Sequence, residues 1–348
     1  MNPYVLATLL SSLGLGTTLT FASSHWLLAW MGLEINTLAI VPLMAQHHHP
    51  RAVEATTKYF LTQATAAAVI LFASTSNAWI TGEWNITSMS SPIATAMILA
   101  ALALKIGLAP MHFWMPEVLQ GLDLFTGLVL STWQKLAPFA LIMQTAQAFD
   151  PLLLTILGLT STLVGGWGGL NQTQLRKILA YSSIAHMGWM IIILQYAPHL
   201  TFLGLFTYIL MTSAAFLTLK LSYATKLNTL ATTWSKSPLL TATAALVLLS
   251  LGGLPPLTGF MPKWLILQEL AKQGLPLTAT MMALAALISL YFYLRLCYAM
   301  TLTISPNTAT STTPWRAQTT QISFPLSLTT VMALGLLPIT PIITALLI

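Results

Sequence analysis

The sequence predicts an all-α, polytopic membrane protein of about eleven transmembrane helices, and three observations support this fold class. Hydrophobic residues make up 56% of the 348 residues and charged residues only 6%, whereas a soluble domain is about 25% charged. The mean hydropathy is +0.79. The apolar runs are about 20 residues long, which suffices for a helix to cross a hydrocarbon core of about 30 Å. A membrane barrel would instead show alternating segments of about ten residues.

Prolines, glycines, charges and polar clusters divide the chain into eleven expected spans, which together form one integral membrane domain, 1–348. The first span has no basic region before it, since the first basic residue is Arg51, so we expect a retained membrane anchor rather than a signal or transit peptide. The expected spans are 3–22, 25–45, 57–81, 92–110, 123–146, 149–171, 175–195, 200–223, 239–262, 276–299 and 322–345.

The connections between these spans carry three features that bear on structure. The hairpin 46–56 contains three consecutive histidines; a solvated interfacial loop is favoured over a metal site, because adjacent residues point in different directions and no carboxylate or Cys completes a coordination shell. The fourth and ninth spans end near Pro110 and Pro262, where a helix breaks or continues beyond its expected end. The longest polar stretch, 303–321, is expected to be an extramembrane connector before the last span.

The distribution of Lys and Arg predicts the orientation in the membrane. On the side opposite the N-terminus, Lys272 is the only clear loop cation, whereas nine cations gather on the N-terminal side. The N-terminus should therefore face the negatively charged compartment, which is the cytoplasm or the mitochondrial matrix, and the C-terminus the opposite one. The nine cations are Arg51, Lys58, Arg176, Lys177, Lys220, Lys226, Lys236, Arg295 and Arg316.

Composition excludes several functional classes for the chain itself. The net charge of +6 comes from 13 Lys and Arg residues scattered through an apolar chain, without the basic stripe of a nucleic-acid-binding protein. The single cysteine, Cys297, has no partner for a disulfide or an iron–sulfur site. No GxGxxG, Walker or HExxH motif occurs. We therefore expect this chain to bind no nucleic acid, metal or redox cofactor.

An internal repeat relates two proline-rich segments, GLAPMHFWMPEV at 107–118 and GLPPLTGFMPKW at 253–264. At an offset of 146, two prolines spaced by six, and three further residues, are identical. Since the copies end the fourth and ninth spans, five spans apart, they should run in opposite directions through the membrane. Inverted repeats with discontinuous helices are typical of secondary transporters. The alternative is a pair of ordinary proline kinks in packed helices.

Four charged residues lie inside, or at the break of, long apolar segments: Glu34, Lys105, Lys135 and Lys263. Each buried charge costs about 2.5–3.5 kcal/mol on insertion scales unless it pairs, hydrates or is neutralised. One carboxylate and three lysines on four helices could form a proton relay, or static ion pairs that only fix helix packing. His186 in the seventh span and His112 in the first proline motif could extend the relay or be neutral packing residues.

The segments ALKIGLAPMHFWMPEV, STWQKLAPF, QTQLRKILAYSSIAHMGW and LGGLPPLTGFMPKW closely resemble the subunit 2 family of mitochondrial NADH dehydrogenase, an antiporter-like membrane-arm family of respiratory complex I. The resemblance covers the whole chain. It implies a location in the inner mitochondrial membrane, where the distribution of Lys and Arg predicts the N-terminus on the matrix side. It also implies that Glu34 pairs with a lysine at position 105, and that Lys135 and Lys263 continue a polar axis.

The resemblance has further implications for helices, partners and cofactors. Bacterial members carry three more N-terminal helices, so lipid or another subunit is expected to cover the region around Glu34. Expected partners are the other complex I subunits, notably subunits 4 and 4L and accessory subunits, together with membrane lipids. FMN, iron–sulfur clusters, NADH and ubiquinone would be bound in other subunits, and this chain would translocate protons as quinone reduction drives it.

Two other functions fit the same residues. An Mrp-type cation/proton antiporter subunit would share the repeat and the lysines, although the eleven spans suggest dependence on neighbouring subunits. A structural subunit that holds a membrane arm together without conducting would carry the charges as packing devices. Mutation of Lys105, with assembly followed separately from pumping, discriminates between conduction and a structural role.

Overall fold

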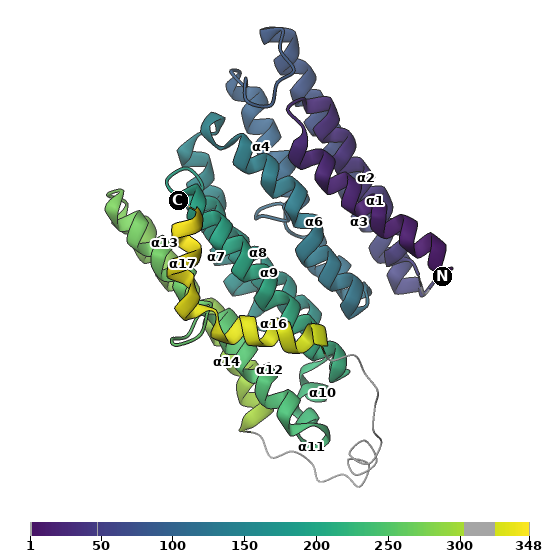
Figure 1. Cartoon of the computed structure of the whole chain (residues 1–348), viewed down its shortest axis with the longest axis vertical. Helices are drawn as coiled ribbons and strands as arrows, with labels where there is room; N and C mark the ends of the chain where they lie inside the picture. The colour runs from purple at the N-terminus through teal and green to yellow at the C-terminus, as the bar shows by residue number, and fades with distance from the viewer. Residues whose placement is uncertain (1, 47, 303–323, 348) are drawn as a thin grey trace. The chain divides into compact units, whose positions relative to one another are not determined.

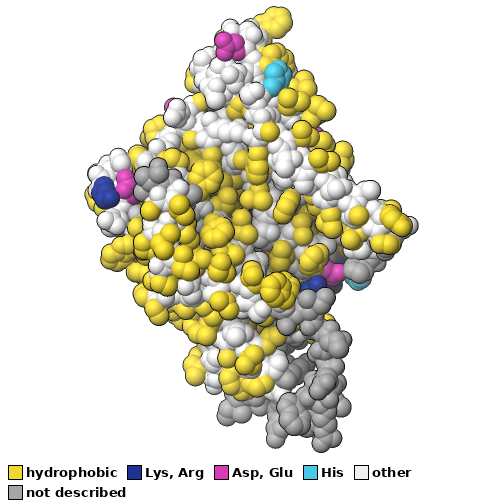
Figure 2. Space-filling model, viewed as in Figure 1, with side chains coloured by type: hydrophobic (Ala, Val, Ile, Leu, Met, Phe, Trp, Pro, Cys, Tyr) yellow, Lys and Arg dark blue, Asp and Glu magenta, His cyan; other side chains and the backbone are white. Residues whose placement is uncertain are grey.

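The computed structural model describes residues 2–46, 48–302 and 324–347. The chain divides into two compact units, Met1–Leu157 and Gly158–Ile348, and the regular elements of the described residues are helices, accompanied by two isolated bridges (Figure 1). Hydrophobic side chains dominate the visible face in Figure 2 and charged ones are sparse, as expected for a surface that faces lipid.

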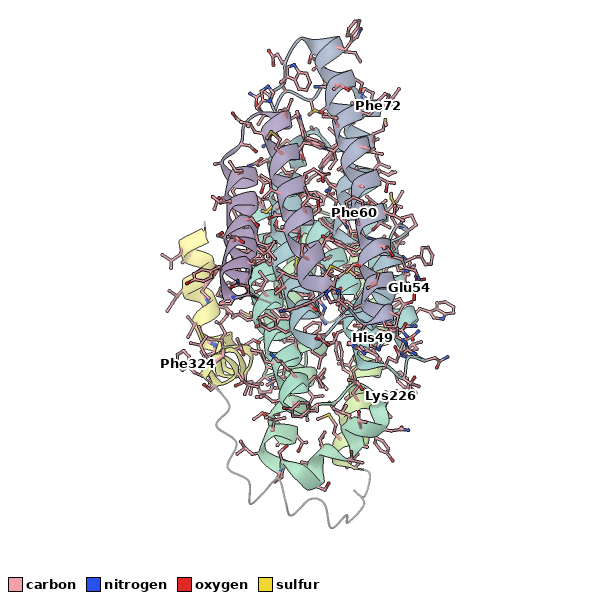
Figure 3. All side chains as sticks on the ribbon, turned by 90° about the vertical axis from the view of Figure 1, so that its right-hand side faces the viewer. His49, Glu54, Phe60, Phe72, Lys226 and Phe324 are labelled. Atoms are coloured by element: carbon pink, nitrogen blue, oxygen red, sulfur yellow. The ribbon has the colours of Figure 1, made fainter. Side chains whose placement is uncertain are left out.

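The first unit is a helical bundle in which α1 packs along α2, and α3 packs against α4 and α5. Gly16 and Gly32 permit the close approach of α1 to α2, because a Cβ on Gly32 would lie 2.9 Å from the Gly16 carbonyl oxygen. Phe60 and Phe72 project from α3 (Figure 3). The helices are α1 (Pro3–Ala22), α2 (Trp26–Met44), α3 (Pro50–Thr81), α4 (Pro92–Ile106), α5 (Trp114–Gly121) and α6 (Leu124–Gln144), then η1 (Ala146–Ala148) and α7 (Pro151–Gly169), which continues into the second unit.

The second unit has a core in which α9 contacts α8, α12, α13 and α16, and α12 packs on α14. Proline in the first turn of α9, α12 and α14 supplies the fixed φ with which a helix can begin. The helices are α8 (Leu175–Ile193), α9 (Pro198–Leu221), α10 (Leu227–Ala231), α11 (Thr233–Lys236), α12 (Pro238–Gly252), α13 (Phe260–Lys272), α14 (Pro276–Thr301), α16 (Phe324–Gly335), η3 (Leu337–Ile339) and α17 (Thr340–Leu347).

Each of the eleven expected spans contains a helix, and the all-α membrane fold is confirmed. Among the described residues, six helices are long and apolar enough to cross a membrane, or seven if a pair bent by 64°, Phe324–Gly335 and Leu337–Leu346, is one span. Four details differ from expectation. The third helix begins seven residues earlier, at Pro50 rather than 57. The ninth span, expected over 239–262, ends at Gly252 because the chain breaks there. The helices α5, α10, α11 and α13 were not expected. The last span is bent. The expected connector 303–321 lies outside the described residues.

Both proline motifs interrupt a helix, so the prediction of proline-broken helices is confirmed. At the offset of 146, the start of α4 at Pro92 corresponds to the start of α12 at Pro238, and the ends correspond as well. After a non-helical stretch, α5 resumes at Trp114 and α13 at Phe260, again 146 residues apart. The Ala109–Pro110 and Pro255–Pro256 peptide bonds are cis in both copies.

The two helices also end through the same hydrogen bonds. The amides of Gly107 and Leu108 donate to the Ala103 carbonyl oxygen at 2.9 Å, and the corresponding amides of 253 and 254 donate to Leu249 at 3.1 and 3.3 Å. Gly107 and Gly253 have φ values of 86° and 81°, a left-handed conformation that glycine adopts without a Cβ penalty. The repeat seen in the sequence is therefore a repeat of backbone geometry.

Candidate functional site

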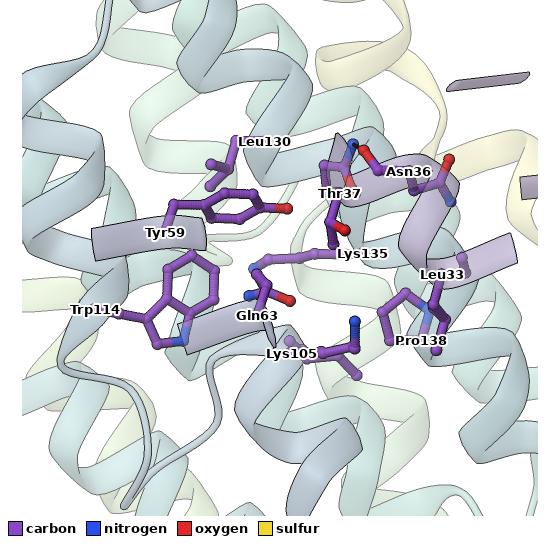
Figure 4. Close-up of a pocket in the computed structure, with 13 residues that line it drawn as sticks. Leu33, Asn36, Thr37, Tyr59, Gln63, Lys105, Trp114, Leu130, Lys135 and Pro138 are labelled. Atoms are coloured by element: carbon purple, nitrogen blue, oxygen red, sulfur yellow. Dashed lines mark hydrogen bonds between the residues drawn. The ribbon is translucent and has the colours of Figure 1, made fainter. Parts of the chain in front are cut away.

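Lys105 and Lys135 meet at one small internal cavity of the first unit. Lys105 lies in the last turn of α4 and Lys135 in the middle of α6, and their side chains are 5% and 2% exposed. Both line a cavity of about 10 Å³, as Figure 4 shows. The other polar residues that line it are Asn36 and Thr37 of α2, Tyr59 and Gln63 of α3, and Gln134 of α6.

Several buried polar atoms at this cavity have no hydrogen-bond partner among the described residues. They are the Lys105 Nζ, the Gln63 Nε2, and both the Oδ1 and Nδ2 atoms of Asn36. Buried polar groups are nearly always hydrogen bonded, and ordered water often supplies the missing partner. A cavity of this size is close to the lower limit of roughly 10–15 Å³ for one water molecule, so the arrangement suits a single bound water.

Glu34 lies on α2 beside this cavity, next to the lining residue Leu33. Its carboxylate oxygen Oε2 accepts a hydrogen bond of 3.1 Å from the Thr37 hydroxyl. The Glu34 charge also interacts electrostatically with Lys105 and Tyr59. Because the Lys105 Nζ has no hydrogen-bond partner, this attraction acts across space rather than through a direct hydrogen bond. A carboxylate on α2 and a lysine on α4 thus attract each other beside the cavity that Lys135 of α6 also lines.

The first helix break contributes an aromatic wall to the same cavity. The Trp114 indole lines the cavity and donates from Nε1 to the carbonyl oxygen of Leu104 at 2.9 Å. Its ring meets the buried Tyr59 ring edge-on, with centroids 5.7 Å apart. His112 is 5% exposed within the break, and its ring centroid lies 4.4 Å from that of Phe113.

Lys263 lies in the second unit, in the first turn of α13. Its Nζ donates to the carbonyl oxygen of Gly252, the last residue of α12, at 2.8 Å. The C-terminal end of a helix carries a partial negative charge that favours a cation. The second break thus places a lysine directly on the end of the helix that it interrupts.

His186 belongs to a buried polar cluster of the second unit. Its Nδ1 lies 2.7 Å from the Ser182 carbonyl oxygen, and since a carbonyl only accepts, Nδ1 carries the proton. The His186 ring centroid is 5.7 Å from that of Tyr208. Tyr208 and Tyr293 are fully buried and interact electrostatically with each other. Tyr208 also interacts with Ser183, and Tyr293 with Ser182.

The six predicted site residues divide between the units: Glu34, Lys105, Lys135 and His112 in the first, Lys263 and His186 in the second. Asn36, Gln63, Tyr59 and Trp114 were not predicted, nor were Tyr208 and Tyr293. The sequence did carry one indication of Tyr59 and Gln63: they are four residues apart in a helix and therefore lie on the same face. In the histidine-rich hairpin, residue 47 lies outside the described residues; among those described, no group of three or more His, Cys, Asp and Glu side chains could hold a metal ion.

Comparisons with known proteins agree with this architecture. The family model "NADH:quinone oxidoreductase/Mrp antiporter, TM" matches residues 23–289, and "NADH dehydrogenase subunit 2 C-terminus" matches residues 290–344. The NADH-ubiquinone oxidoreductase chain 2 proteins of Carassius auratus and Cyprinus carpio are 84% and 82% identical over 346 and 343 residues, with 99% of each chain covered.

The fold of this chain is similar to that of chains in solved membrane complexes. A chain of the respiratory complex I of Thermus thermophilus with bound aureothin is 30% identical with a TM-score of 0.85, covering 99% of this chain and 80% of that chain. A chain of the Mrp complex of Dietzia sp. is 16% identical with a TM-score of 0.86, covering 97% and 76%, and shares the fold. The chain therefore belongs to the antiporter-like membrane subunits of the NADH:quinone oxidoreductase/Mrp family, and within them to the NADH dehydrogenase subunit 2 family.

Proposed function

We propose that this chain translocates protons across the inner mitochondrial membrane through Glu34, Lys105, Lys135 and Lys263, coupled to electron transfer from NADH to ubiquinone in other subunits. The chain acts as one membrane domain, 1–348, with its N-terminus on the matrix side. The observation that carries the proposal is Lys105: its buried amine has no hydrogen-bond partner within the part of the chain that the structure describes, and it shares a small polar cavity with Lys135.

The cavity geometry supports proton exchange between the two lysines. Two like charges on one cavity in a low dielectric repel strongly, so they are poorly stabilised as ammonium groups at the same time. The Glu34 carboxylate interacts electrostatically with Lys105. A water molecule held by Asn36, Gln63 and Lys105 would give the proton a path between the amines. Any change that moves the Glu34 charge would then shift the proton from one lysine to the other.

The remaining charges extend the proposal into the second unit. Lys263 is held by a helix end through one hydrogen bond, which a conformational change could break and reform. His186, with its buried neighbours Tyr208 and Tyr293, is a further proposed member of the relay in the second unit. His112 lies at the first break and belongs to the same proposed route.

Cofactors and partners follow from membership of the complex. In this proposal, FMN, iron–sulfur clusters, NADH and ubiquinone are bound by other subunits, and this chain holds none of them. Subunits 4 and 4L, accessory subunits and membrane lipids are the proposed neighbours. They would cover the exposed outer surface of α1, where Tyr4 is 80% and Leu15 60% exposed.

An Mrp-type cation/proton antiporter subunit is the second candidate, and it is favoured by the shared fold. A static, purely structural role would instead require each buried charge to be satisfied. The unpartnered Lys105 Nζ is an observation against that role, because an unsatisfied buried polar group costs about 1–3 kcal/mol, and more for a charged group.

The test is the Lys105→Met substitution in the assembled complex. We expect proton pumping and ubiquinone reduction to fall at least about tenfold, the effect of about 1.4 kcal/mol on a barrier, because the amine that exchanges the proton is gone. Pumping is measured in proteoliposomes, and NADH oxidation by an artificial acceptor should be unchanged. Lys272→Met is the matched control, since that side chain is 62% exposed. Full pumping in Lys105→Met, with normal assembly, would contradict the proposal.

A further inference from the structure

The two helix breaks share one backbone conformation, but different side chains donate hydrogen bonds to the carbonyl groups at the ends of α4 and α12. At the first break the Trp114 indole donates to the Leu104 oxygen at 2.9 Å. At the second break the Lys263 ammonium donates to the Gly252 oxygen at 2.8 Å. Carbonyl groups in the last turn of a helix have no partner within the helix, so such donors replace the missing hydrogen bonds.

The repeat offset explains why each copy must use its own donor. Trp114 corresponds to Phe260, whose ring has no N–H or O–H group. Lys263 corresponds to Glu117, an ionised carboxylate that only accepts, and Glu117 is turned to Lys58 of α3 at 2.9 Å. Trp114 therefore caps the end of α4, and Lys263 caps the end of α12.

Because the two breaks use different donors, the hydrogen bonding of Lys105 differs from that of Lys263. Lys263 is engaged in a hydrogen bond to its helix end. The Lys105 Nζ is buried without a partner and lines the cavity, although it lies in the last turn of α4, where a lysine readily bonds to the terminal carbonyl groups. The Trp114 indole already donates to one of those carbonyl groups, that of Leu104, the residue just before Lys105.

We infer that Trp114 is a positioning residue: by bonding to the Leu104 oxygen, its indole keeps the Lys105 amine directed into the cavity rather than onto the end of α4. The inference rests on the proposed function of Lys105 and adds a residue that acts through it. The contact of the indole with Tyr59 and the Lys58–Glu117 ion pair both tie this part of α5 to α3, and so help to hold the indole at the carbonyl.

The experiment replaces Trp114 by Phe in the assembled complex, which removes the donor and keeps an aromatic ring. We expect the pumping rate and the kcat of ubiquinone reduction to fall at least about threefold, with the KM values for NADH and ubiquinone unchanged. A high-resolution structure of the variant should show the Lys105 Nζ within hydrogen-bond distance of a carbonyl oxygen of the last turn of α4. Trp133→Phe, on the exposed side of α6 (42% exposed), is the matched control and should pump normally.

Normal pumping in Trp114→Phe, or reduced pumping with the Lys105 amine still directed into the cavity, overturns the inference. If Trp114→Phe does not assemble, Trp114→His, which keeps a ring N–H donor, is measured: pumping in that variant supports the inference, and failure of both to assemble shows a packing role instead. Loss of pumping in Lys105→Met together with normal pumping in Trp114→Phe would leave the proposed function standing and reject only the role of Trp114.

Discussion

Many Ser and Thr side chains among the described residues form hydrogen bonds to carbonyl groups of their own helix. Thr17 donates to the Gly14 carbonyl oxygen at 2.8 Å, and Ser183 to that of Ala180 at 2.6 Å. A Ser or Thr side chain in an apolar helix can therefore be buried without a partner on another helix. The longer side chains of Asn36, Gln63 and Lys105 lack such local bonds, so their convergence on one cavity marks a site and is not a general property of the bundle.

Asn36 depends on a glycine of the neighbouring helix, which gives a prediction for a single residue. A Cβ on Gly16 would lie 2.4 Å from the Asn36 Oδ1 and 2.8 Å from the Gly32 carbonyl oxygen, so Gly16→Ala must displace α1 or the Asn36 side chain. We expect a loss of about 1–3 kcal/mol, as for overpacking elsewhere, measured as a lower thermal midpoint of the complex. Gly14→Ala is the control, because nothing lies within 4 Å of its Cβ, and equal effects of the two substitutions would contradict the packing argument.

At the scale of helices, Gly253 combines a left-handed backbone conformation with close contact to Lys263, a residue of the proposed relay. In Gly253→Ala the new Cβ would lie 3.0 Å from the Lys263 Nζ, in a left-handed conformation that costs about 1–2 kcal/mol for a residue with a Cβ. We expect both lower stability and reduced pumping, since Lys263 would be pushed from the Gly252 oxygen. Pumping per assembled complex is the measurement.

Gly82→Ala separates these two effects. Gly82 ends α3 with a φ of 76°, and nothing lies within 4 Å of its Cβ. This control should lose stability through the backbone alone and should pump normally once assembled. If Gly253→Ala behaved in the same way, the contact with Lys263 would have no role in pumping.

The elements of this fold could be predicted from sequence to different degrees. Proline and glycine have strong and local backbone effects, so the breaks after Ile106 and Gly252 were predicted at the correct motifs. The eight-residue helix α5 was not, because it resumes directly after the break and its apolar residues continue the preceding pattern. The bend between α16 and α17 was not predicted, although Gly335, Pro338 and Pro341 lie at it; α16 packs on α9 and α12, and α17 on α9.

Across the whole molecule, the scarcity of charge made part of the site predictable. A charged residue in an apolar helix is costly, so Glu34, Lys105, Lys135 and Lys263 stood out from the sequence alone. Gln63 and Trp114 are uncharged, so the search for charged residues in apolar helices did not find them. Their roles depend on which faces of α3, α5 and α6 meet, and that is determined by packing.

The orientation in the membrane is a prediction for the whole molecule that the two ends of α3 can test. This helix has 32 residues, about 48 Å at 1.5 Å per residue, so its ends lie on opposite sides of a hydrocarbon core of about 30 Å. Arg51 and Glu83, exposed at its two ends, can each be replaced by Cys, because the only native cysteine, Cys297, is buried.

The excess of Lys and Arg on the N-terminal side places residue 51 in the negatively charged matrix and residue 83 in the intermembrane space. A membrane-impermeant maleimide added to intact mitoplasts should therefore label Glu83→Cys and spare Arg51→Cys, and inverted vesicles should give the opposite result. Denatured samples of both variants give the full labelling against which each is compared. The reverse pattern would place the N-terminus outside the matrix and contradict the predicted orientation.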